Sequence, residues 1–274
     1  MQRQRVIFVG DATYHEFHDA ISWLREYCAL TVVDSPRAAA SRVAAAGPPN
    51  AMVLAQARPG VFSQSQIEAL HRLAPLSRLI GLHGSWCEGE LRTGAPWRGV
   101  VRVYWHQFVP RLANELSDRR GPALLAQPRT ATDAEQFLAT AALPEVQRRG
   151  LVVIKTPSQE AYSALADACT GLGHATVWSA PRQPTFATAA ELGIWDCRTA
   201  LQSDCQPLAE FVAQLHPAPV IALLGFPRCS DHDTASRCGV RAVVSKPYLV
   251  HDLWSEMSRV VMRQQATRPK LSAA

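Results

Sequence analysis

The chain has 274 residues, of which 47% are apolar and 19% are charged, and its 28 Lys and Arg residues exceed its 23 Asp and Glu residues by five. This length and apolar content exclude a disordered, collagen-like or coiled-coil protein and leave room for one large domain or two small ones. No apolar run is long enough for a membrane span and the first residues lack a signal-peptide pattern, so we expect a cytoplasmic protein without a membrane partner.

In the first half, apolar and β-branched runs predict strands that are buried on both faces, as in a parallel sheet. These strands cover residues 6–9, 30–33, 51–55, 78–82 and 100–104. Helical patterns alternate with them, at 17–28, 36–46, 67–73 and 110–116. Alternation of strand and helix is typical of a doubly wound α/β domain.

Residues 121–150 lack a strand pattern and carry three prolines, with one short helix predicted over 132–143 from a capping box at Thr132. The alternation then resumes, with strands at 151–154, 175–178, 192–195, 220–224 and 242–244. The repeat predicts a tandem duplication of one α/β domain. We expect domains over 1–118 and 150–265, a linker over 119–149 and a flexible tail over 266–274.

One segment of the second copy has a specific pattern, in which a strand that begins after Gly239 ends in Lys246, Pro247 and Tyr248. This segment resembles the fifth strand, with its Lys-Pro-aromatic end, of the CheY-like receiver domain of bacterial two-component response regulators. The resemblance covers residues 149–262. It implies a flavodoxin-like fold with five parallel strands, and it places Asp196 at the family's phosphoacceptor position.

The second copy departs from the family at the metal site, because Lys155 and Thr156 stand where receivers carry an acidic pair. A lysine cannot coordinate Mg²⁺, which takes oxygen ligands. We therefore expect an ion-pair cluster of Lys155, Asp196 and Lys246 in place of a phosphorylation site. Two alternatives stay open: phosphorylation of Asp196, or a strand-end carboxylate that only caps backbone groups.

The first copy resembles the same family more weakly, over residues 4–117, and Ala55 stands at its phosphoacceptor position. Asp11 remains from the acidic pair, His83 takes the place of a Thr at the end of the fourth strand, and an alignment without gaps puts His106 at the lysine position. Ligands bind at the carboxyl ends of strands in such sheets, so these three residues define a candidate pocket. With Cys87 they are candidates for a transition-metal set, but their spacing matches no metal signature. Hydrogen bonding among themselves is the simpler expectation, and no cofactor or metal is predicted.

Residues 84–99 stand where a receiver has its fourth helix, and their Gly and Pro residues favour a loop. Side chains typical of interfaces gather in and after this loop. They are Trp86, Cys87, Trp97, Tyr104 and Trp105. The corresponding face is the family's usual interaction surface, so we expect a protein partner or self-association here. The alternative is that the tryptophans cover the domain's own core.

The sequence contains no P-loop, GxGxxG, GxSxG, HExxH or kinase signature, so an enzyme is not expected. The seven cysteines form no CxxC pair, which favours reduced thiols. The basic residues form no run, so nucleic acid is not an expected partner. The sequence predicts a non-catalytic signal-transduction protein, a tandem of degenerate receiver-like domains that serves as a protein-interaction adaptor or scaffold in a phosphorelay-type pathway. The alternatives are a ligand or metal sensor that uses the Asp11, His83 and His106 pocket, and a response regulator phosphorylated at Asp196.

Overall fold

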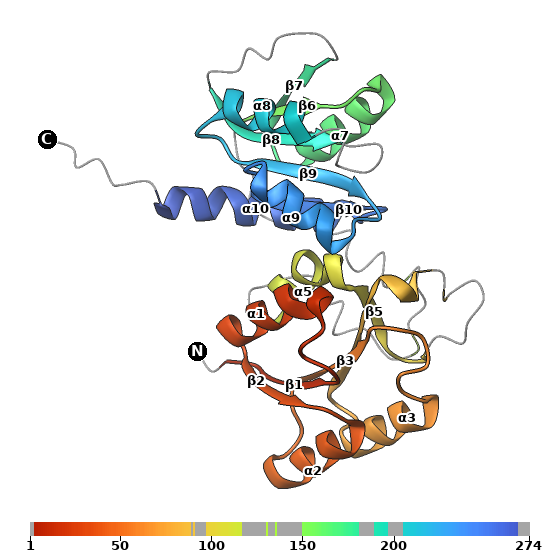
Figure 1. Cartoon of the computed structure of the whole chain (residues 1–274). Coiled ribbons are helices and arrows are strands. Elements are labelled where there is room, and N and C mark those ends of the chain that lie inside the picture. The colour runs from red at the N-terminus through yellow and green to blue at the C-terminus, as the bar shows by residue number, and fades with distance from the viewer. Residues whose placement is uncertain are drawn as a thin grey trace, which may run out of the picture. The chain divides into compact units, whose positions relative to one another are not determined.

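The computed structural model describes residues 3–88, 90, 97–116, 130, 135, 150–180, 189–196 and 205–267. The chain divides into two compact units, and each contains one five-stranded sheet (Figure 1). All of the helix predicted over 132–143 except residue 135 lies outside the described residues, as does most of the predicted tail.

In the first unit, strands and helices alternate along the chain. The strands are β1 (Arg5–Val9), β2 (Ala29–Val33), β3 (Ala51–Gln56), β4 (Arg78–His83) and β5 (Val101–Tyr104). The helices are η1 (His15–Phe17), α1 (His18–Tyr27), α2 (Pro36–Ala46), α3 (Gln64–Leu73), η2 (Ser85–Cys87), η3 (Trp105–Gln107) and α5 (Phe108–Leu116). Ser35 and Ser63 begin α2 and α3, where their hydroxyls accept hydrogen bonds from backbone N–H groups of the first turn.

The second unit repeats this alternation. Its strands are β6 (Leu151–Lys155), β7 (Ala175–Ser179), β8 (Ala190–Asp196), β9 (Val220–Gly225) and β10 (Ala242–Lys246). Its helices are α7 (Gln159–Gly171), α8 (Cys205–Leu215), α9 (Cys229–Arg237) and α10 (Val250–Thr267). At the start of helix α9, the Asp231 carboxylate caps the first turn by accepting a hydrogen bond from the backbone N–H of Arg228.

The two sheets have the same topology. Every neighbouring pair of strands is parallel, in the order β2-β1-β3-β4-β5 in the first unit and β7-β6-β8-β9-β10 in the second. By position within each unit both orders read 2-1-3-4-5, the flavodoxin-like order that CheY shares. The predicted fold class, two doubly wound parallel five-stranded α/β units, is confirmed.

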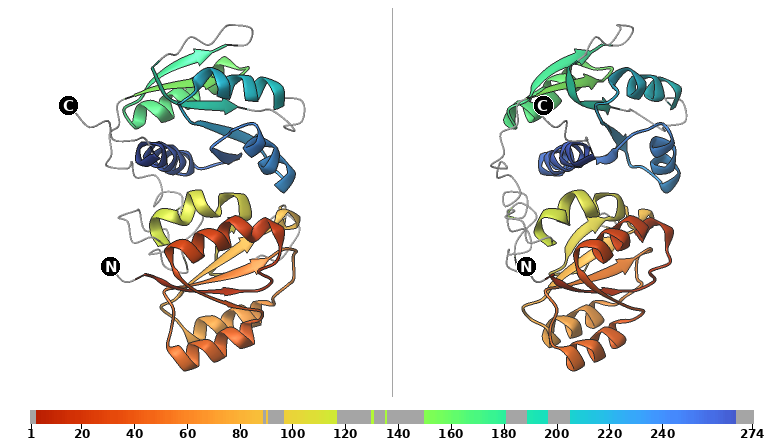
Figure 2. Two further views of the ribbon diagram at one scale, coloured as in Figure 1. Left: turned by 60° about the vertical axis from the view of Figure 1, so that its left-hand side comes forward. Right: turned by 90° about the vertical axis from the view of Figure 1, so that its left-hand side faces the viewer.

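Helices cover both faces of each sheet (Figures 1 and 2). Helices α1 and α5 lie on one face of the first sheet and α2 and α3 on the other, while α7 and α10 lie opposite α8 and α9 in the second. Strand residues such as Phe8, Met52 and Ile154 are therefore fully buried, which explains the near-continuous apolar runs. Across the described residues, no helix combines the length and the hydropathy that a membrane span requires.

Candidate functional site

Asp196 is the last residue of β8, and both of its carboxylate oxygens have a side-chain partner. Lys246 Nζ, at the end of β10, lies 2.6 Å from Oδ1, and Thr156 Oγ1 donates a hydrogen bond to Oδ2 at 2.8 Å. The Asp196 side chain is 10% exposed and that of Lys246 is 30% exposed, so the pair is largely shielded from water. The predicted pairing of Asp196 with Lys246 is confirmed, and Thr156 adds a contact that the sequence analysis missed.

Lys155 is not part of this cluster, so the predicted three-residue ion-pair cluster is wrong. Its Nζ lies 5.1 Å from the ring centroid of Trp195 and 5.7 Å from that of Phe211. Lys155 and Trp195 are partners in the register of β6 and β8. Because successive strand residues point to opposite faces, Asp196 points away from the face that Lys155 occupies. The aromatic rings, rather than the carboxylate, stabilise this ammonium group by cation–π contacts.

Tyr248 follows the ion pair in the chain and packs against the core of the second unit. Burial raises the pKa of the Tyr248 phenol to about 12, with smaller electrostatic contributions from Asp196 and Cys169. The carboxylate of Asp196 therefore acts electrostatically on the half-buried Tyr248.

In the first unit, His83 ends β4 and is 1% exposed. The ring centroids of Trp97 and Tyr104 lie 5.6 and 6.1 Å from that of the imidazole. Burial, together with the nearby charge of Arg102, lowers the pKa of His83 to about 3, so the imidazole is neutral at physiological pH. The Nδ1 atom of His83 lies 3.8 Å from Oε2 of the buried Glu90.

Glu90 accepts hydrogen bonds from two donors, one on β3 and one on β5, and the sequence analysis did not select it as a site residue. Arg102 Nη2 donates to Oε2 at 2.9 Å, and Gln56 Nε2 donates to Oε1 at 3.1 Å. The buried Cys87 thiol donates to the Gln56 carbonyl at 3.2 Å, and burial raises the pKa of Cys87 to about 11. One potential ligand atom from each of His83, Cys87 and Glu90 lies within 4.8 Å of the other two.

Asp11 does not join the histidines, so the predicted pocket of Asp11, His83 and His106 is wrong in this respect. The Asp11 carboxylate is exposed and accepts hydrogen bonds from the Thr13 backbone N–H at 2.8 Å and from the Thr13 hydroxyl at 2.6 Å. These bonds lower the pKa of the Asp11 carboxyl. The carboxylate is therefore bound within its own turn, by a residue two positions further along the chain.

His106 lies one residue beyond the place of the receiver lysine. Tyr104 is the last residue of β5, and when the registers of the two sheets are compared, Trp105 stands where Lys246 stands in the second unit. The imidazole of His106 instead stacks on the Tyr104 ring at a centroid distance of 5.9 Å, and its Nε2 lies 3.7 Å from Glu88 Oε1. The alignment without gaps is therefore one residue out in β5.

The predicted interaction loop separates into one exposed side chain and several that are turned inward. Trp86 is 68% exposed, and the guanidinium carbon of Arg58 lies 5.6 Å from its ring centroid. Trp97 is buried and donates a hydrogen bond from its indole N–H to the Phe62 carbonyl at 3.0 Å. The remaining members are buried or half-buried: Cys87, Tyr104 and Trp105. Residues 89 and 91–96 of the predicted loop lie outside the described residues.

The second unit also has an exposed aromatic side chain shortly after its fourth strand. Phe226 directly follows β9, the fourth strand of its sheet, and is 63% exposed, while Trp86 follows β4 after two residues. The φ angle of Phe226 is 46°, in the left-handed region, which costs a bulky residue about 1 kcal/mol or more. Both units therefore present an aromatic ring to solvent just beyond the carboxyl end of the fourth strand.

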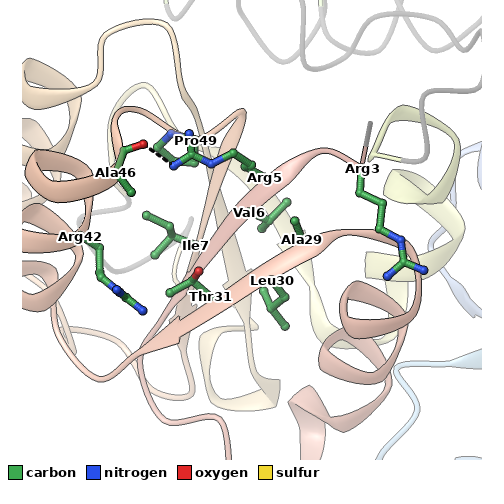
Figure 3. Close-up of a pocket in the computed structure, with 10 residues that line it drawn as sticks. All are labelled: Arg3, Arg5, Val6, Ile7, Ala29, Leu30, Thr31, Arg42, Ala46 and Pro49. Atoms are coloured by element: carbon green, nitrogen blue, oxygen red, sulfur yellow. Dashed lines mark hydrogen bonds between the residues drawn. The ribbon is translucent and has the colours of Figure 1, made fainter. Parts of the chain in front are cut away.

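A separate recess of about 510 Å³ lies towards the amino ends of β1 and β2, and arginines surround it (Figure 3). The Arg5 guanidinium is already bound, since it donates to the Ala46 and Gly47 carbonyls at 2.8 and 3.1 Å. Arg3 and Arg42 are exposed. This recess lies away from the carboxyl ends of the strands, where the residues described above gather.

The sequence matches no protein-family model and no curated protein. Solved structures similar to this chain contain receiver domains. A response regulator receiver protein from Pseudoalteromonas atlantica is 16% identical, with 42% of this chain and 98% of that chain covered and a TM-score of 0.34. The receiver domain of a signal transduction histidine kinase from Syntrophus aciditrophicus is 20% identical, with 46% and 98% covered and a TM-score of 0.36. The E. coli RcsC C-terminus, which contains a linker region and a phosphoreceiver domain, is 10% identical, with 98% and 97% covered and a TM-score of 0.35.

Proposed function

We propose that this chain is a cytoplasmic, non-catalytic signal-transduction protein whose receiver-like units bind partner proteins without being phosphorylated on aspartate. The absence of aspartate phosphorylation is supported by the contacts of Asp196, whose carboxylate binds Lys246 and Thr156. Attack on a phosphodonor requires a free carboxylate oxygen and a divalent cation that neutralises the transferring group. Here Lys246 already supplies the neutralising charge.

The residues around Asp196 do not fit the magnesium ion that receiver domains use. Lys155 and Thr156 replace the acidic pair, and the Lys155 ammonium group lies over aromatic rings on the other face of the sheet. Thr156 offers a hydroxyl that already donates to Asp196. Mg²⁺ requires several oxygen ligands in near-octahedral geometry, so a single aspartate is a poor site. In the first unit, Ala55 offers no nucleophile at all.

The exposed aromatic side chains support the proposal that the two units bind partner proteins. Trp86 and Phe226 both lie just beyond the carboxyl end of the fourth strand of their units, and the backbone of Phe226 is strained there. Aromatic residues dominate the binding energy of protein interfaces, and backbone strain concentrates at functional positions. These two rings are therefore the expected contacts to a partner.

Phosphorylation is tested by incubating the chain with acetyl phosphate and Mg²⁺ and measuring its intact mass, with an active receiver domain as the positive control. We expect no acid-labile phosphate. A stoichiometric phosphate that is lost in the Asp196→Asn variant would contradict the proposal, whereas phosphate retained in that variant would lie elsewhere.

Partner binding is tested by quantitative affinity capture from lysate of the native host, with light-scattering measurements of molar mass for self-association. We expect Trp86→Ser and Phe226→Ser each to lose captured partners or the dimer. The matched control is Leu76→Ser. Leu76 is 92% exposed, but it precedes β4 and therefore lies at the amino end of the strands, away from Trp86. If all variants capture the same partners and have the same molar mass as the wild type, the proposed interface is wrong.

A further inference from the structure

The buried group of His83, Cys87 and Glu90 combines three side chains that ligate transition metals. We propose that these residues bind one Zn²⁺ ion in the first unit. This site goes beyond the proposed function and does not depend on it, because it uses none of the residues around Asp196. It also differs from the pocket predicted from the sequence, since Cys87 and Glu90 take the places of Asp11 and His106.

The imidazole of His83 lacks the partners that a buried histidine normally has. Neither ring nitrogen has a hydrogen-bond partner among the described residues, although the side chain is 1% exposed. Buried polar atoms are almost always satisfied, and an exception calls for a missing water or ion.

The distances are close to those of a tetrahedral site. Zinc bonds of 2.0–2.3 Å place neighbouring ligand atoms about 3.5 Å apart. The His83 Nδ1 and Glu90 Oε2 atoms are 3.8 Å apart, and the three candidate ligand atoms all lie within 4.8 Å of one another. Movements of about one ångström or less per side chain therefore close the site around an ion. Thiolate, imidazole and carboxylate are all common zinc ligands.

The two acidic ligands offset the charge of the ion, while the guanidinium of Arg102, whose side chain is 18% exposed, keeps one positive charge beside Glu90. Zn²⁺ displaces the proton of the Cys87 thiol to solvent, and the resulting thiolate and the Glu90 carboxylate together neutralise the ion. Neutralisation matters because an unpaired charge is costly in a buried site. Arg102 and Gln56 already hold Glu90 in place from β5 and β3, as outer-shell residues commonly hold metal ligands.

Two further features fit this arrangement. Gly81 leaves room for the imidazole, since a Cβ atom at this position would lie 2.6 Å from His83 Nε2. The Gln56 Oε1 atom has no hydrogen-bond partner among the described residues, while its amide nitrogen lies 3.7 Å from Cys87 Sγ.

The test uses the full chain, stripped of metal with EDTA and then dialysed against Zn²⁺ or Co²⁺. We expect one zinc ion per chain by elemental analysis and, with Co²⁺, a thiolate-to-cobalt charge-transfer band. Cys87→Ala is expected to abolish the band and to lose the zinc. Cys169→Ala is the matched control, because it removes a buried thiol in the second unit and should change neither.

Two variants guard against misfolding and adventitious binding. Glu90→Gln keeps the shape of the side chain but removes its charge, and we expect it to weaken zinc binding at least tenfold in competition with a colorimetric chelator. His15 and His18 are exposed with ring centroids 6.2 Å apart, so their double change to Gln tests surface binding and should leave the zinc in place. The proposal is overturned if the stripped chain takes up no zinc, if zinc persists in Cys87→Ala, if Glu90→Gln binds as tightly as the wild type, or if the His15/His18 variant loses the ion.

Discussion

Removal of the Asp196 carboxylate should destabilise the second unit by an amount that the structure allows us to estimate. In Asp196→Ala, the Thr156 hydroxyl loses its acceptor at 2% exposure, which costs about 1–2 kcal/mol. Lys246 is 30% exposed and regains water, so the loss of the ion pair adds about 1 kcal/mol. We expect the free energy of unfolding to fall by about 2–3 kcal/mol in total. Each kcal/mol lowers the Tm by roughly 4 °C for a unit of this size. Asp196→Asn keeps an acceptor for Thr156 and should cost about 1 kcal/mol.

Urea unfolding followed by circular dichroism, fitted with one transition for each unit, measures these differences. The matched control is Asp167→Ala, an exposed carboxylate on α7, which should change the free energy of unfolding by about 0.5 kcal/mol or less. High salt should reduce only the ion-pair part of the effect. If Asp196→Ala is as stable as Asp167→Ala, or more stable than Asp196→Asn, the carboxylate is not held as described.

Three further predictions concern the same unit. Lys155→Met should lose about 0.5–1 kcal/mol in the same unfolding assay, because it removes only the cation–π contacts. The folded unit keeps the Tyr248 phenol neutral, so its contribution to stability is present below pH 10 and is lost as the pH rises towards 12. Phenolate absorbance should report this titration. The Asp196→Asn variant should lower the pKa of Tyr248, because it removes a nearby negative charge. The Sγ atoms of Cys205 and Cys238 lie 2.8 Å apart, so diamide, an azo oxidant that takes up two hydrogens, should convert them to a disulfide that peptide mapping detects and that Cys205→Ser lacks.

The positions of the strands could be predicted from the sequence because both faces of each sheet are covered. Fully buried strands show as continuous apolar runs, and the helices between them have one apolar face, so the alternation is visible residue by residue. The end of β10 could also be predicted, because the Lys246-Pro247 step is a short motif that can be recognised directly in the sequence. The pairing of Lys246 with Asp196 was expected from the resemblance to receiver domains, which places both residues at the same site.

The side-chain contacts at the strand ends were less predictable, because they depend on which face a residue occupies. Lys155 and Thr156 are neighbours, yet one packs over Trp195 and the other bonds to Asp196, and only the register of β6 with β8 separates them. Glu90 was missed for another reason. It reaches the first sheet from a loop without periodicity, and its partners come from β3 and β5.

The backbone conformation of Phe226 has a consequence for attempts to engineer this protein. Glycine adopts a positive φ angle without steric cost, so Phe226→Gly removes both the strain and an exposed apolar ring. A screen that selects only for thermal stability would therefore enrich changes at this position. The variants that such a screen favours would be those that have lost the aromatic contact, and a stability-based design should hold Phe226 fixed.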